Sequence, residues 1–182
     1  MKRTLAEHLG STPHLSPLLH KLRRLGLSAP DGLLRLAVRR GCTHYAPPDY
    51  DTVPTHEPGR ERLSDLELAI ALCSAAQQYN PVLVRCAAQL LGADGISAAA
   101  LVRLARMERC ESVIRHIAQA GAKADVGREL FWHEVLSQLP ARDTPRAGVL
   151  PHSSRFMVQA GLTGPKRAGA ARQIWLRPRA TP

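Results

Sequence analysis

The chain has 182 residues and a formal net charge of +10, from 25 basic and 15 acidic residues. Hydrophobic residues make up 45% of it and aromatic residues only 4%, which suffices for an aliphatic core and argues against global disorder. No apolar run is long enough to cross a membrane as a helix, and the first residues lack the apolar stretch of a secretory signal. We therefore expect a cytoplasmic protein with one domain, or with one domain and attached tails.

Residues 1–42 predict a basic helical hairpin. A short helix over residues 2–9 comes first and ends before Gly10. A clearer helix begins at Ser16-Pro17, with serine as the N-cap and proline in the first helical position, where its missing N–H is not needed. This second helix ends at Gly26.

The partner helix of the hairpin begins at Ser28 or Asp31. It ends at Arg39-Arg40-Gly41, because cations favour the last turn of a helix and glycine favours the position beyond it. Residues 43–62 then form a connector rich in proline, and proline is excluded from helix interiors.

Residues 63–140 predict a helical core. Ser64 and Glu67 form a capping box, in which each side chain accepts from the other's main-chain N–H. The helix that follows is expected from Asp65 to about Gln78, and it is apolar almost all round, which is typical of a buried helix.

Three further helical patterns complete the core. Asn80-Pro81 begins a helix with one apolar face that ends at Gly92, and Ser97 caps the next. The last helix is expected over residues 126–139, where Phe131, Trp132, Val135, Leu136 and Leu139 share one face.

The pattern over residues 98–120 fits either one long helix or two helices broken near residues 107–109. Residues 69–89 and 99–119 align without gaps at an offset of 30, with five identities in 21 positions. This repeat favours two short helices, since 20–50 residues is the size of a helical hairpin in solenoid proteins. Chance similarity between alanine-rich helices explains the alignment equally well.

Residues 141–182 form a basic C-terminal extension. Two short β-prone segments, residues 155–159 and 172–176, flank a loop rich in glycine and basic residues. They predict either a β-hairpin or an extended tail that pins Phe156 and Trp175 to the helical body.

The four cysteines, Cys42, Cys73, Cys86 and Cys110, show no Cys-x-x-Cys spacing, so we interpret them as small hydrophobic residues in a reducing compartment. Cys42 and His44, with His56 further on, could converge on a metal, but their spacing matches no common zinc pattern. We therefore predict no metal and no cofactor, and leave this one possibility open.

The charge is concentrated at the two ends. Residues 1–45 carry eight basic and two acidic groups, and residues 141–182 carry eight basic groups and one acidic group. Residues 63–140, with seven basic and eight acidic groups, are nearly neutral. Basic segments beside a neutral core are typical of arms that bind phosphates. The excess of 21 arginines over 4 lysines also fits a compositional origin of the charge.

We predict a mainly α protein, with helical hairpins packed as a small bundle or a short solenoid-like array and an irregular basic C-terminal extension. No catalytic arrangement is visible, so an enzyme is disfavoured. The leading hypothesis is a binding protein whose basic ends contact nucleic acid or another polyanion, and Trp175 either stacks on a base or packs in the core. The alternative is a protein-interaction adaptor whose charge is incidental. The candidate contact residues are Arg39, Arg40, Lys166, Arg167, Arg172, Trp175 and Arg177.

Overall fold

The computed structural model describes residues 16–45, 63–74, 77, 79–139, 148–160 and 172–179. The helix expected over residues 2–9 and most of the connector, residues 46–62, lie outside these ranges.

The described residues are mainly helical, as the sequence predicts. The α-helices are α2 (Pro17–Arg24), α3 (Pro30–Arg39), α4 (Asp65–Cys73), α5 (Pro81–Leu91), α6 (Ala98–Met107), α7 (Glu111–Ala124) and α8 (Glu129–Gln138). Two short 3-10 helices, η1 (Thr43–Tyr45) and η4 (Ser153–Phe156), precede the connector and the sheet. The strands are β1 (Met157–Ala160) and β2 (Arg172–Trp175).

The expected N-caps are confirmed. The side chains of Ser16, Ser64, Asn80 and Ser97 each accept a hydrogen bond from a main-chain N–H of the helix that follows. The capping box is complete, because the Glu67 carboxylate also accepts from the Ser64 N–H. These contacts are local, which explains why the sequence predicts them.

Several helix ends differ from the prediction. Helix α4 ends at Cys73 rather than near Gln78, since Ser74 adopts an extended backbone with ψ of 148°. Helix α3 begins at Pro30, with Ala29 as an N-cap that makes no side-chain bond. Helix α8 begins at Glu129 instead of residue 126, because Gly127 has φ of +91° and sits in a turn.

Residues 98–120 form two helices, the outcome that the repeat favours. Helix α6 ends at Met107, and α7 begins at Glu111. Arg109, between them, has φ of +54°, a left-handed conformation that no α-helix contains. Helix α7 then continues past residue 120, the end of the predicted range, to Ala124.

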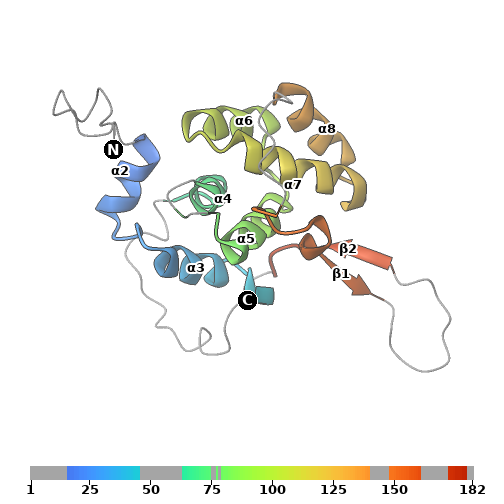
Figure 1. Cartoon of the computed structure of the whole chain (residues 1–182), viewed down its shortest axis with the longest axis horizontal. Helices are drawn as coiled ribbons and strands as arrows, with labels where there is room; N and C mark the ends of the chain where they lie inside the picture. The colour runs from blue at the N-terminus through green and yellow to red at the C-terminus, as the bar shows by residue number, and fades with distance from the viewer. Residues whose placement is uncertain are drawn as a thin grey trace.

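The helices form layers that follow the chain (Figure 1). Helix α4 packs against α5, and α3 packs against both. Helix α8 closes the other end by packing against α6 and α7, and α4 also contacts α6. In the view of Figure 1, α4 and α5 therefore lie between the N-terminal hairpin and the group of α6, α7 and α8.

One hydrophobic cluster joins all described parts of the chain. It includes Leu18 and Leu33 from the N-terminal hairpin, Leu68 and Leu83 from the helical core, and Trp175 from the C-terminal extension. Segments that differ in charge along the sequence thus share one core.

The C-terminal extension forms an antiparallel β-hairpin, which was one of the two predicted outcomes. Met157 lies opposite Trp175, and Ala160 lies opposite Arg172. The hairpin projects from the side of the bundle near α7 (Figure 1). Its base is anchored by Phe156 and Trp175, which are 1% and 3% exposed, so the hairpin is also pinned to the helical body.

No helix within the described ranges has the length and apolar character needed to cross a lipid bilayer.

Candidate functional site

The two basic ends of the chain meet at the end of α3. The N–H of Arg179, in the C-terminal segment, donates to the carbonyl of Gly41 at 3.0 Å. Gly41 has φ of +90°, and a Cβ there would collide with the main chain of Arg179. Only glycine therefore allows both this turn and the close approach of the C-terminal segment.

Arg40 holds this end of α3 to the helical core. Its guanidinium donates to the Asp65 carboxylate and to the carbonyl of Leu63. Its side chain is 12% exposed, against 51% for Asp65. Arg39 is half-buried beside it. The structure thus gives Arg40 an intramolecular partner, which a contact with phosphate would have to replace.

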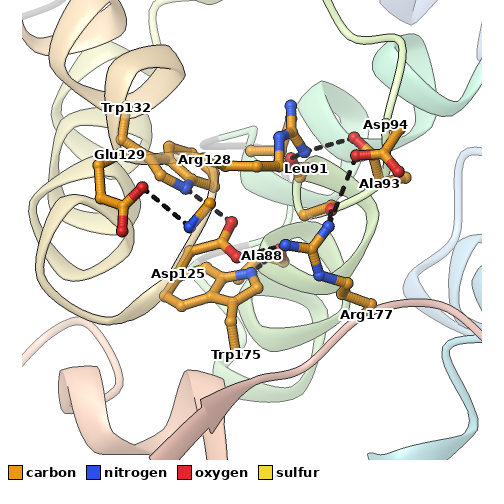
Figure 2. Close-up of polar contacts among 12 residues, drawn as sticks. Ala88, Leu91, Ala93, Asp94, Asp125, Arg128, Glu129, Trp132, Trp175 and Arg177 are labelled. Atoms are coloured by element: carbon orange, nitrogen blue, oxygen red, sulfur yellow. Dashed lines mark hydrogen bonds and ion pairs between the residues drawn. The ribbon is translucent and has the colours of Figure 1, made fainter.

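Arg177 closes a polar network at the base of the hairpin (Figure 2). Its guanidinium donates to Asp125 Oδ1 at 2.7 Å and to the carbonyl of Gly92 at 3.0 Å. The other oxygen of Asp125 accepts from Trp132 Nε1 at 2.8 Å. Asp125 is 1% exposed, so its charge depends on both donors. Asp94, at the surface, lies 3.6 Å from Arg177.

Arg128 joins this network from the start of α8 (Figure 2). Its guanidinium donates to the carbonyls of Leu91, at 3.0 Å, and Ala93, after the end of α5. It also lies 4.3 Å from the ring centre of Phe131. Partial burial lowers the pKa of Arg128, and the carboxylates of Asp125 and Asp94 oppose that shift. These contacts fasten α8 to the end of α5.

Trp175 packs in the core, one of the two roles considered for it. Its Nε1 donates to the carbonyl of Ala88 at 3.3 Å, and its ring centre lies 5.5 Å from that of Trp132. A Cβ on Gly92 would approach the indole to 2.7 Å. An indole covered in this way offers no open face on which a base could stack.

Three of the predicted contact residues are described incompletely. Lys166 and Arg167 lie outside the described ranges, as does the side chain of Arg172, whose backbone begins β2. The hypothesis that these three cations contact phosphates stays a prediction.

Helix α2 presents exposed cations that the candidate residues omitted. His20, Arg23 and Arg24 are exposed, and no acidic residue occurs in this helix. Within the described part of the chain, Arg23 and Arg24 have no ion-pair partner. The signal was present in the sequence as a run of four basic or titratable side chains over residues 20–24.

A pocket of about 300 Å³ lies beside this basic face, lined by Pro17, His20, Lys21, Arg24 and Leu25. Lys21 is the one member paired with an acid here, because its Nζ lies 2.6 Å from Glu67. Burial alone would raise the pKa of Glu67, but hydrogen bonds from Lys21 and Ser64 together lower it below its usual range. Arg24 has no acidic partner among the described residues, so its guanidinium is open to an anion.

The cysteines are buried and reduced. Cys42 is fully buried, and its thiol lies 3.6 Å from the carbonyl of Cys86. His44 is exposed, and His56 lies outside the described residues. In the described ranges no group of three histidine, cysteine, aspartate or glutamate side chains is placed to hold a metal ion.

Comparison with protein-family models, with curated proteins and with solved structures finds no match to this chain.

Proposed function

We propose that this protein binds nucleic acid through its basic ends, which the helical scaffold holds together. The observation that carries the proposal is the contact between Arg179 and Gly41, at 3.0 Å. It joins the basic C-terminal extension to the basic N-terminal hairpin, although the two are separated by a nearly neutral core in sequence. Charge from both ends is thereby combined on one scaffold.

The structure divides the cations into two groups by their partners. Arg40 and Arg177 pair with Asp65 and Asp125, so they position the two segments. Arg23 and Arg24 are exposed on α2, and Arg179 is exposed beside Gly41. We assign the phosphate contacts to this exposed group, together with Lys166, Arg167 and Arg172 of the extension.

This division has a physical basis. Each exposed cation that meets a phosphate releases a condensed counterion, whereas a cation already paired with a carboxylate gains less. The affinity should therefore fall steeply with salt, and the slope should report the number of exposed cations in contact.

The test is fluorescence anisotropy of the full chain with a labelled single-stranded RNA and a labelled duplex DNA, repeated over a salt series. Two double variants remove the contacts: Arg23→Glu with Arg24→Glu, and Arg167→Glu with Arg172→Glu. Each should weaken binding about tenfold or more near 0.1 M salt and reduce the salt slope by about one per lost contact. The ratio of the wild-type affinities for the RNA and for the duplex DNA then shows which nucleic acid is preferred.

The matched control is Arg103→Glu. Arg103 is exposed on α6, in the nearly neutral stretch of sequence between the two basic ends. This variant carries the same change of charge per site and should retain nearly full affinity. An equal loss of binding free energy per substituted arginine in all variants would show only a response to net charge, and no binding by the wild type at low salt would refute the proposal.

A further inference from the structure

Strand β2 has an outer edge with which no other strand of the described residues pairs. The N–H of Leu176 donates to the carbonyl of Phe156 at 3.0 Å, and these two residues lie opposite each other in the register of the hairpin. In an antiparallel pair, hydrogen-bonded positions alternate with positions whose main-chain groups point outward. The N–H and C=O groups of Gln173 and Trp175 therefore point away from β1.

These outward groups are unpaired within the described part of the chain. No hydrogen bond to another described element uses the main-chain N–H or C=O of Gln173 or Trp175. The bond from Trp175 to the carbonyl of Ala88 is donated by the indole Nε1. A row of unpaired N–H and C=O groups on an edge strand is a template for another strand. Natural proteins usually block such edges, and some use them to bind extended peptides.

A pocket adjoins this edge. Its volume is about 280 Å³, and its lining comes from the turn between α7 and α8 and from β2: Ala124, Asp125, Val126, Gln173, Ile174, Trp175 and Arg177. Val126 and Ile174 are 61% and 44% exposed, although both are large and apolar. An edge that presents main-chain groups and an apolar pocket together can hold a strand and one of its side chains.

The charge around the edge indicates which partner fits. Residues 155–182 contain six basic residues and no acidic one. Asp125, the acidic residue in the described lining, is 1% exposed and already bound by Trp132 and Arg177. A second copy of the chain would bring two such basic hairpins together, so like-charge repulsion disfavours it as the occupant.

We propose that the outer edge of β2 binds an extended acidic peptide of a protein partner by strand addition. The peptide pairs with the main-chain groups of Gln173 and Trp175. One apolar side chain enters the pocket beside Val126 and Ile174, and flanking acidic residues complement the net positive charge of residues 155–182. The main-chain groups and the pocket of this site are not used in the proposed binding of nucleic acid, although both proposals draw on the positive charge of the C-terminal extension.

The experiment uses the full chain and a set of labelled synthetic peptides. Each has a central Leu, Ile, Val or Phe between valines, with Glu and Asp on both sides. Two control peptides carry the same side chains: one has alternate backbone amides methylated, which removes the strand hydrogen bonds, and the other has lysine in place of each acidic residue. Anisotropy gives affinities, and ¹⁵N NMR reports the amide N–H groups of Gln173 and Trp175.

The chain supplies a matched pair of variants. Gln173→Pro removes one outward N–H without affecting the bonds to β1, and edge strands tolerate proline. Gln159→Pro makes the same change on the outer edge of β1, since Gln159 lies opposite Gln173. Val126→Asp places a negative charge at the pocket rim, where an acidic peptide would be repelled.

We expect at least one acidic peptide to bind, with shifts and slower exchange at the amides of Gln173 and Trp175. Gln173→Pro and Val126→Asp should each weaken binding about fivefold or more, whereas Gln159→Pro should not. Failure of every acidic peptide at concentrations up to about 1 mM would overturn the proposal. Equal binding of the methylated peptide, or of a nucleic acid at the same amides, would also overturn it.

Discussion

Tyr79 and Arg109, thirty residues apart, adopt the same left-handed backbone conformation, each with φ of +54°. Each directly precedes the N-cap of a helix, and those helices, α5 and α7, begin thirty residues apart. The offset equals that of the sequence alignment. The correspondence is confined to the starts of α5 and α7. Helices α4 and α6 begin at Asp65 and Ala98, which are 33 residues apart, and α5 packs mainly on α4 whereas α7 packs mainly on α8. Chance similarity between alanine-rich helices explains the alignment equally well.

The left-handed conformation of Arg109 predicts how a glycine at this position changes the stability of the protein. Arg109 is exposed, so Arg109→Gly removes little packing while it relieves a conformation that is unfavourable for residues with a Cβ. We expect the free energy of unfolding to rise by about 0.5–1 kcal/mol. Urea denaturation measures it. The control, Arg103→Gly inside α6, should lower stability by about 1 kcal/mol, and a similar loss in both variants would contradict this account.

A second prediction concerns Gly121, which lies against the ring of Trp132. A Cβ on Gly121 would lie 2.5 Å from the Trp132 ring, which is itself fully buried. Gly121→Ala should therefore lower stability by about 1–3 kcal/mol, because a packed core cannot move aside. Gly32→Ala is the control, since a Cβ there meets its nearest atom, on Leu27, at an ordinary 3.5 Å.

Gly32 lies inside α3, so the control should raise stability by about 0.5–1 kcal/mol through helix propensity alone. Thermal unfolding of the two variants beside the wild type checks both signs. A neutral Gly121→Ala variant would mean that Trp132 moves freely, contrary to its burial.

The local part of this fold could be predicted from the sequence. The capping box at Ser64 and the cap with proline at Asn80 depend on contacts within one helical turn, so the residue types alone reveal them. The end of α4 could not be predicted, because its apolar pattern continues past Cys73 while the backbone at Ser74 becomes extended. No local signal marks that change.

The candidate site, like the fold, could be predicted from the sequence only in part. Exposed cations can be counted in a sequence, but their partners cannot be assigned without the fold. Arg177 bonds to Asp125 across 52 positions, and Arg179 meets Gly41 across a greater separation. Such pairs follow no periodicity, and so Arg40 and Arg177 were predicted as phosphate contacts although the structure pairs both with carboxylates.

The pair of Arg177 and Asp125 yields a third prediction. Asp125→Asn keeps the shape of the side chain but removes the nearer of the two carboxylates that pair with Arg177, and leaves only the exposed Asp94 at 3.6 Å. Because Arg177 is 39% exposed, water compensates in part, and we expect a loss of about 1–3 kcal/mol. Trp132 donates to Asp125, so its fluorescence should change as well. Asp94→Asn, at a residue that is 91% exposed, should cost less than about 0.5 kcal/mol.

The depressed pKa of Glu67 predicts how stability varies with pH. Burial opposes the shift, but hydrogen bonds from Lys21 and Ser64 hold the folded pKa below the ordinary value of 4.5. A carboxyl with a lower pKa in the folded state contributes stability above its unfolded pKa and loses it as the pH falls through the folded pKa. Glu67→Gln should thus cost about 0.5–1 kcal/mol at pH 7, and the difference should vanish in acid.

Urea denaturation of wild type and Glu67→Gln between pH 7 and about pH 3 tests this sign. Repeating both in a Lys21→Met background should reduce the difference at pH 7, since Lys21 supplies one of the hydrogen bonds. If the difference in unfolding free energy between wild type and Glu67→Gln instead widened toward low pH, the folded state would favour the protonated carboxyl over the charged one.

The buried thiols predict a pattern of chemical reactivity. Burial raises the pKa of Cys86 and of Cys110 to about 12, so near pH 8 both remain neutral thiols, which are poor nucleophiles. Cys42 and Cys73 are also fully buried, and burial raises the pKa of each. Iodoacetamide should therefore modify none of the four cysteines in the native full chain, and all four in urea, as read by intact mass. Because access requires unfolding, a destabilising variant such as Gly121→Ala should be labelled faster at every cysteine. Rapid native labelling of a single cysteine would instead identify a local opening of the core at that residue.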